Sequence, residues 1–443
     1  MEPASLLEEI RFGYGPRRGR PLAKGGVDPD RLLAQLTTPD PAGAAWNQPT
    51  LAGRGDLIAR YAKERKSDLG VSPETTQAIK QLWAGDVQSF ILRPTFADAG
   101  FVERLVNLWA NRITVANVSN NVSRVLQPFR DEAIRPHIGG TYGEMLKATL
   151  WHPAMQIYLS QTRSIGPDSQ VGKRRGKGLN ENLAREFLEL HSMRTGYTQA
   201  DVTQLALLLA GMTADEEGNR AVDPRNAQPG KKVVLGQQFD GSDPEAEINR
   251  LVAYVAARPE TARNVAFTLA RHFIADDPPA DLVDSLAAAY LDNDGHLPAV
   301  YRVLLTHSAA NNPERQKLRS PQDFVAASLR LLGVTPEDKD FSKLVRRLPP
   351  TLAAMGQPVY RALRPDGWPE VAQGWMTPPM MAARIDWAVD AARLAEDRVN
   401  PVAMVELALG DYASPLLKQS ASRAEQRWEG LAVLIGSPEF SRR

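Results

Sequence analysis

Helix-start signals recur along this 443-residue chain and constrain its fold more than any other feature. Thr141 and Thr198 each precede an acidic residue by three positions, which is capping-box spacing, and Ser320 precedes a proline that suits the first helical position. Apolar residues recur with a helical period of about 3.6 in segments 101–113, 247–257, 262–274, 280–291, 323–333 and 380–394. Alternating strand patterns are scarce, and 233–235 is the best short candidate. We therefore expect an all-α, multi-helix globular array with long irregular loops and at most a minor β element.

Length and composition bound the organisation of the chain. The length suits two or three structural units, and the loops favour one helical unit over 1–215 and a second over 242–443, although one continuous domain is also compatible. The hydrophobic content of 43 % and charged content of 24 % are typical of a soluble globular protein. The complete absence of cysteine excludes disulfides, thiolate metal sites and cysteine nucleophiles.

Charge and hydropathy limit partners and location. A net charge of +1 gives no global field that would attract nucleic acid or anionic lipid, so neither is an expected partner. No apolar run is long enough to span a bilayer. The first twenty residues contain early acidic residues and lack the apolar core of a secretory signal. We expect a cytoplasmic protein by default, with export alongside a signal-bearing partner as the alternative.

The segment 180–191, NENLAREFLELH, contains the densest group of functional side chains. On a helical wheel, Leu183, Phe187 and Leu190 form an apolar stripe, and Asn180 and His191 fall within the same arc. The opposite face carries Glu181, Asn182, Arg185, Glu186 and Glu189. The pattern therefore predicts a two-faced helix that directs His191 toward the core.

The wheel argues against a metal centre on this helix. The spacing is E-x-x-E-x-H, which is neither the Glu-x-x-His of di-iron helices nor the His-Glu-x-x-His of zinc hydrolases. His191 and the nearest carboxylates do not share a face, so one helix cannot chelate a metal with them. We predict no metal and no other cofactor, and we interpret His191 as a core histidine hydrogen-bonded to a neighbouring helix.

The carboxylate face of this helix has two interpretations. If solvent or arginines cover it, Glu186 and Glu189 belong to a structural network, which is the commoner case. If it faces a pocket, one of these glutamates would serve as acid or base and Arg185 as electrostatic support. Asn180, Asn182 and His191 would then be candidate binding residues.

A long loop over 356–379 contains Asp366, Trp368 and Trp375. Tryptophans on ordered loops can stack sugars or peptides, but more often they fix an irregular loop to the core. We expect fixing as the main role. We also expect this loop to form one wall of any binding cleft. The candidate binding residues on that wall are Asp366, Trp368 and Trp375.

Several motifs resemble those of the bacterial family of unknown function DUF1800. The strongest is Asn180-Glu181-Asn182-x-Ala184-Arg185-Glu186 followed by Glu189-Leu190-His191 and then Tyr197-Thr198-Gln199. Further matches are Arg11-Phe12-Gly13-Tyr14-Gly15, His152-Pro153-Ala154-Met155, Asp277-Pro278-Pro279, Gly356-Gln357-Pro358 and Gly367-Trp368-Pro369. The resemblance covers nearly the whole chain and implies a mostly helical protein without an established activity.

The resemblance also implies a partner. Genes of the family often lie beside those of a second family, DUF1501, whose members resemble the alkaline phosphatase superfamily and tend to carry export signals. The chain departs from the family pattern by carrying Arg112 and Ala227 in two motifs that usually hold a histidine. We therefore expect a binding or scaffold component that acts with an exported DUF1501-like protein. The alternative is a hydrolase or transferase that acts on a saccharide or peptide.

Overall fold

The computed structural model describes residues 3–22, 25–176, 178–215, 220–395 and 398–443. Helices dominate this part of the chain, as predicted, and the only strands among these residues form two short antiparallel hairpins. The strands are β1 (Met212–Ala214) with β2 (Arg220–Val222), and β3 (Lys232–Val234) with β4 (Gln237–Phe239). The predicted all-α class with a minor β element is confirmed.

The longer helices follow one another through most of the chain. They are α1 (Pro3–Arg11), α4 (Leu51–Arg65), α5 (Pro73–Phe96), α6 (Gly100–Arg112), α9 (Tyr142–Trp151), α13 (Gln199–Leu209), α14 (Pro244–Ala256), α15 (Pro259–Phe273), α16 (Ala280–Asp292), α17 (Leu297–Thr306), α18 (Pro321–Leu332), α19 (Phe341–Ala354), α20 (Pro378–Leu394), α21 (Pro401–Leu409), α22 (Pro415–Arg423) and α23 (Arg427–Gly436).

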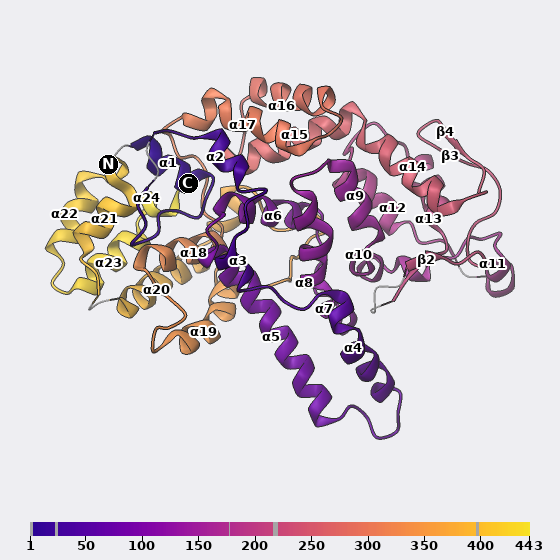
Figure 1. The fold of residues 1–443 in the computed structure, drawn as a ribbon, viewed down its shortest axis with the longest axis horizontal. Coiled ribbons are helices and arrows are strands. Elements are labelled where there is room, and N and C mark those ends of the chain that lie inside the picture. The colour runs from indigo at the N-terminus through magenta and orange to yellow at the C-terminus, as the bar shows by residue number, and fades with distance from the viewer. Residues whose placement is uncertain (1–2, 23–24, 177, 216–219, 396–397) are drawn as a thin grey trace.

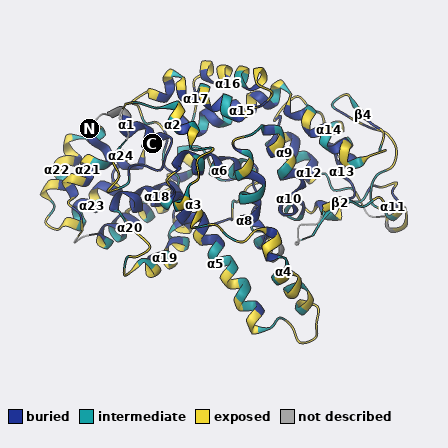
Figure 2. Cartoon of the chain, viewed as in Figure 1, coloured by how far each residue is buried: buried dark blue, intermediate teal, exposed yellow. Residues whose placement is uncertain are grey.

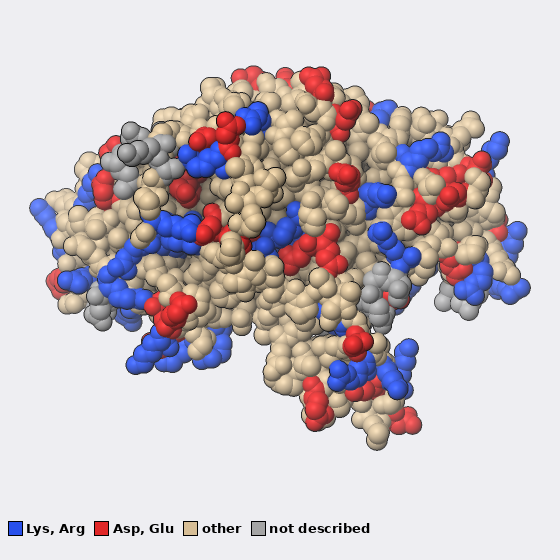
Figure 3. Space-filling view, viewed as in Figure 1, with Lys and Arg blue, Asp and Glu red and all other residues tan. Residues whose placement is uncertain are grey.

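The helices form an elongated body from which the α4–α5 hairpin projects as an arm (Figure 1). The two labelled chain ends lie together at one end of this body, near α21–α23, and the β hairpins lie at the other. Buried residues run through the middle of the body, whereas the outer surfaces of the arm are exposed (Figure 2). Basic and acidic side chains intermix on the face shown in Figure 3, in agreement with the small net charge.

Local signals set the helix starts that the sequence predicts. Thr141 and Glu144 form a reciprocal capping box, with Glu144 N donating to Thr141 Oγ1 at 3.2 Å and Thr141 N to Glu144 Oε2 at 3.0 Å. Thr198 and Asp201 form the second box. At the start of α18, Asp323 N donates to Ser320 Oγ at 3.2 Å. These bonds satisfy backbone N–H groups that have no partner within their helix.

Side chains of the central helix α6 contact elements from the second half of the chain. Trp109 Nε1 donates to the hydroxyl of Tyr301 on α17 at 3.0 Å, and Arg104 pairs with Asp323 on α18 at 3.0 Å. All four residues are buried. These contacts join the segments 1–215 and 242–443 at the middle of the body. The proposed division into two units stays a prediction.

No helix among the described residues has the length and apolar character needed to cross a membrane.

The signature segment 180–191 is not one continuous α-helix, which corrects the helical-wheel prediction. A short helix, α12 (Asn182–Glu186), continues into a π-helical turn, η4 (Phe187–His191). The turn ends where Ser192 Oγ donates to Phe187 O at 2.6 Å. Because a π turn holds an extra residue, the side chains after Phe187 rotate around the axis. Leu188 is therefore fully buried, whereas Leu190 of the predicted apolar stripe is only half-buried.

Candidate functional site: a polar cleft beside the tryptophan loop

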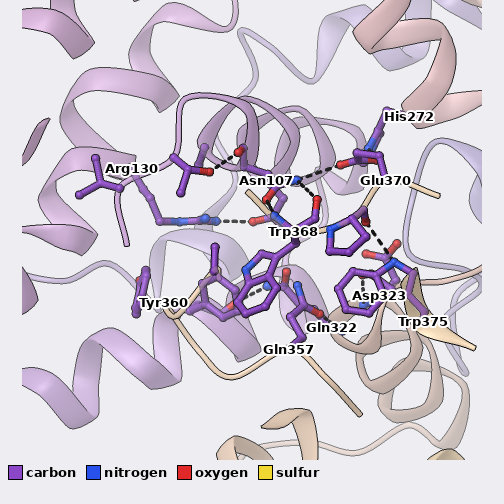
Figure 4. Close-up of a pocket in the computed structure, with 18 of the residues that line it drawn as sticks. Asn107, Arg130, His272, Gln322, Asp323, Gln357, Tyr360, Trp368, Glu370 and Trp375 are labelled. Carbon is purple, nitrogen blue, oxygen red and sulfur yellow. Dashed lines mark hydrogen bonds and ion pairs between the residues drawn. The ribbon is translucent and has the colours of Figure 1, made fainter. Parts of the chain in front are cut away.

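A cavity of about 80 Å³ lies where α6, α15 and the start of α18 meet the loop over 357–375. This volume holds several water molecules or one small polar group. Figure 4 shows the polar and aromatic side chains that surround it, which come from segments far apart in the sequence. Those on which its chemistry depends are Arg130, His272, Asp323, Trp368, Glu370 and Arg443.

Asn111 on α6 holds the tryptophan loop in place. Its Oδ1 accepts from Trp368 N at 2.7 Å, and its Nδ2 donates to Trp368 O and to Glu370 Oε1, both at 3.1 Å. Gly367 makes this approach possible because its φ is +85° and a Cβ at this position would overlap the Asn111 carbonyl oxygen. The Gly367-Trp368-Pro369 motif thus has a steric reason for its glycine.

The two tryptophans of the loop differ in exposure. Trp375 is buried, and its Nε1 donates to Pro369 O at 3.0 Å, so it fixes the loop to itself and to the core. Trp368 is half-buried and lines the cavity, with its ring centroid 6.3 Å from that of Trp375. Trp375 also lines the cavity, but only Trp368 leaves part of its side chain available to a ligand. A binding role for either residue stays a prediction.

His272, near the end of α15, faces Glu370 from the loop (Figure 4). Its Nδ1 lies 2.9 Å from Glu370 Oε2, and its Nε2 is buried without a hydrogen-bond partner among the described residues. Burial lowers the pKa of His272 to about 4, although the charge of Glu370 opposes this shift. At neutral pH the imidazole is therefore uncharged. Its Nδ1–H donates to the carboxylate, which leaves Nε2 as an acceptor.

The two carboxylates of the cleft are both held in the ionised form. Burial alone would raise the pKa of Glu370, but His272, Lys317 and Arg443 outweigh it and lower that pKa to about 2. Burial likewise opposes ionisation of Asp323, yet Arg104 and Arg443 hold its pKa well below the usual range. Neither carboxylate can therefore donate a proton near neutral pH.

A model of the family DUF1800, described as a protein of unknown function, matches residues 9–442. The chain belongs to the DUF1800 family. No curated protein and no solved structure matches it significantly. The resemblance that the sequence motifs indicate is thus confirmed over nearly the whole chain. The fold and the cleft of this DUF1800 protein have to be interpreted from its own residues.

The signature residues of this DUF1800 chain lie outside the cavity lining but come close to the same loop. Glu186 is half-buried, and its pKa is raised by burial, by Glu189 and by Asp366 of the tryptophan loop. Neither Glu186 nor Glu189 accepts a hydrogen bond from any residue that the structure describes. Asp366 Oδ1 lies 3.0 Å from Arg364 Nε but outside hydrogen-bonding geometry. The two glutamates and Asp366 thus form a second, acidic group beside the loop.

The other predicted signature residues have structural contacts. Arg185 donates to Gln199 Oε1 at 2.8 Å and pairs with Glu181 at 3.4 Å. Asn180 Nδ2 donates to the carbonyl oxygens of Leu159 and Ser160, at 2.8 and 3.1 Å. Asn182 is exposed.

His191 is buried, as predicted, but its carbonyl oxygen rather than its ring accepts the inter-helix hydrogen bond, from the Tyr142 hydroxyl at 2.6 Å. Burial, together with the charge of Arg112, lowers the pKa of His191 to about 3. The positive charge of Arg112 beside His191 therefore favours the neutral imidazole.

Apart from the two tryptophans of the loop, the cleft residues are not predicted from the sequence. His272 lies near the end of a helix, and its partner Glu370 is 98 positions away. From the sequence, Asp323 is predicted only as the first residue of the helical segment 323–333. The one sequence signal that pointed to the cleft is the tryptophan loop, which does form a wall of it. Among the described residues, no group of three or more His, Cys, Asp or Glu side chains could hold a metal ion.

Proposed function

We propose that this DUF1800 protein is a binding component that acts with an exported DUF1501-like partner and receives a polar group of its ligand in the cleft. The observation that carries this proposal is the state of the two cleft carboxylates. A carboxylate pair that catalyses hydrolysis needs one protonated acid and one base. Asp323 and Glu370 both have lowered pKa values and both hold basic or hydrogen-bonding partners. This arrangement suits binding better than proton transfer.

The wall of the cleft supports the same role. The half-buried ring of Trp368 offers an amphipathic surface, and its indole N–H has no hydrogen-bond acceptor among the described residues. Partly exposed tryptophans next to fixed polar groups are frequent energetic centres of protein interfaces. The partner itself is suggested by the gene neighbourhood that the family resemblance implies. A polar group of that partner is the occupant that we propose for the cleft.

Co-purification from the native host tests this function. The tagged full chain is expected to recover the DUF1501-like protein, and Trp368→Ala is expected to lose most of it. Leu363→Ala is the matched control, because Leu363 lies in the same loop and is 90 % exposed. Equal recovery with Trp368→Ala would exclude the cleft as the docking site. Failure of the wild-type chain to recover the partner would contradict the proposal as a whole.

A second candidate function has one observation in its favour. The raised pKa of Glu186, next to Glu189 and Asp366, resembles the division of acid and base roles in paired-carboxylate enzymes. Under this alternative the chain is a hydrolase or transferase acting on a saccharide or peptide, with Arg185 as electrostatic support. Turnover of such substrates is expected to fall by about 10²–10⁴-fold in Glu186→Gln. Glu245→Gln on the exposed face of α14 is the control. No turnover by the wild-type chain would eliminate this alternative.

A further inference from the structure

Four buried arginines surround Asp323 at the base of the cleft. Arg104, Arg319, Arg384 and Arg443 are each 1–3 % exposed, and the charge of Asp323 acts on all four. Only two of them pair with it: Arg104 Nη1 lies 3.0 Å and Arg443 Nε 3.4 Å from Asp323 Oδ2. Buried cations without a counter-charge are costly, so an excess of this kind calls for a compensating group.

The neighbouring charges do not supply that compensation. Lys317 Nζ adds another buried cation, which donates to Asp276 Oδ1 at 2.5 Å and to the Glu370 carbonyl oxygen. The carboxylate of Asp276 is therefore taken up by Lys317, which leaves Asp323 and Glu370 as the carboxylates whose charges act on Arg443. Burial lowers the pKa of Arg319 to about 9 and that of Arg443 to about 10, the direction expected for guanidinium groups that lack full compensation.

Several guanidinium nitrogens in this cluster have no acceptor. Arg104 Nη2, Arg319 Nη1, and both Nε and Nη1 of Arg384 are buried without a hydrogen bond among the described residues. The same is true of Nη1 of Arg443, and its Nε approaches Asp323 outside hydrogen-bonding geometry. Buried donors that lack partners are rare in native structures, and each one indicates a missing acceptor.

Among these four arginines, Arg443 is the one that lines the cavity. Lys317 lines it as well, and so does His272, whose Nε2 is an unoccupied acceptor. A ligand entering beside Trp368 would thus meet a cation with a free donor and a neutral acceptor at the same small cavity. A ligand group that carries an anion next to a hydroxyl or N–H matches both, because the anion would accept from Arg443 and the hydroxyl or N–H would donate to His272 Nε2.

We infer that the ligand group received by the cleft is a carboxylate, bound by Arg443. This inference rests on the proposed binding function and specifies its ligand. A guanidinium group pairs well with a carboxylate, and the pair is stronger where water is excluded. A single negative charge suits the site better than a phosphate dianion, because ionised Asp323 and Glu370 share the same wall. The carboxylate could belong to the terminus of a peptide or to an acidic sugar.

Calorimetric titration of the full chain separates these sources. The probes are a short peptide with a free terminal carboxylate, the same peptide amidated, glucuronate, glucose and inorganic phosphate. We expect binding of at least one carboxylate probe and at least tenfold weaker binding of its neutral counterpart. Preference for the free peptide over glucuronate would identify a protein terminus as the source, and the reverse preference an acidic sugar.

Variants at Arg443 show whether this side chain is responsible. Arg443→Gln is expected to weaken carboxylate binding at least tenfold, and Arg443→Lys, which keeps the charge, is expected to weaken it less. Arg442→Gln is the matched control, because Arg442 is the exposed neighbour. If Arg443→Gln does not fold, two measurements still show whether a carboxylate binds at Arg443. These are the affinity of Arg443→Lys and the comparison of the free peptide with the amidated peptide in the wild-type chain.

The outcomes distinguish this inference from the proposed function. Equal binding of acid and neutral probes would overturn the carboxylate inference and leave a binding cleft. Preference for phosphate over both acids would overturn it in favour of a phosphate ligand. If no probe binds while the partner is still recovered in a Trp368-dependent way, the inference alone fails. If no probe binds and no partner is recovered, both fail.

Discussion

Replacement of Gly367 by alanine is expected to detach the tryptophan loop from α6. At a φ of +85°, a Cβ costs about 1–2 kcal/mol from backbone strain alone. In addition, the Cβ would collide with the Asn111 carbonyl oxygen and displace the loop. The three hydrogen bonds between Asn111 and the loop would then be lost, at about 0.5–1.5 kcal/mol each. The free energy of unfolding should therefore fall by more than strain alone explains.

Gly230→Ala is the matched control for this substitution. Its φ of +81° is almost the same, but no atom lies within 4 Å of the added Cβ. Urea unfolding followed by tryptophan fluorescence measures both variants. Gly367→Ala is expected to lose about 3 kcal/mol more than Gly230→Ala, which corresponds to the three hydrogen bonds. Equal losses in the two variants would refute the claim that Asn111 holds the loop.

Two further predictions concern buried charge. Asp86→Asn leaves the fully buried Arg54 without the carboxylate that now pairs with it at 2.7 Å. The free energy of unfolding, measured in urea, should therefore fall by about 3–5 kcal/mol. Asp56→Asn, on the exposed side of α4, is the control, and an equally small loss in both variants would contradict this prediction. The pKa of His272 in the folded chain is about 4, below its ordinary value of 6.5. As the pH falls below 6.5, the unfolded chain therefore binds this proton before the folded chain does. The free energy of unfolding should decrease as the pH drops from 6.5 toward 4. His272→Gln should therefore show a shallower loss of stability over this interval, and an unchanged pH dependence would contradict the neutral state of His272.

Local sequence signals were sufficient for much of the fold. The caps at Thr141, Thr198 and Ser320 depend on residues three positions apart, so their pattern is visible without tertiary information. The π-helical turn at 187–191 was not predictable in this way. Its register is set by burial of Leu188 and by the bond from the Tyr142 hydroxyl to His191 O, which forms only once the segment is packed.

The candidate site shows the same division between local and distant information. The tryptophan loop could be recognised as a cleft wall from its composition, but the groups opposite it could not. Arg443 meets Asp323 across 120 positions of sequence, and His272 meets Glu370 across 98. The excess of buried cations arises because separate segments converge: Arg104 lies on α6, Arg319 just before α18, Arg384 on α20 and Arg443 beyond α23. No single segment of the sequence shows that excess.

The most direct test of the central claim is calorimetric titration of the full chain with its purified DUF1501-like partner. The wild-type chain and Leu363→Ala are expected to bind the partner saturably. Trp368→Ala should bind it about thirtyfold more weakly, which corresponds to the loss of roughly 2 kcal/mol typical of a central tryptophan. The same affinity in Trp368→Ala as in the wild-type chain would contradict the assignment of the cleft as the binding site.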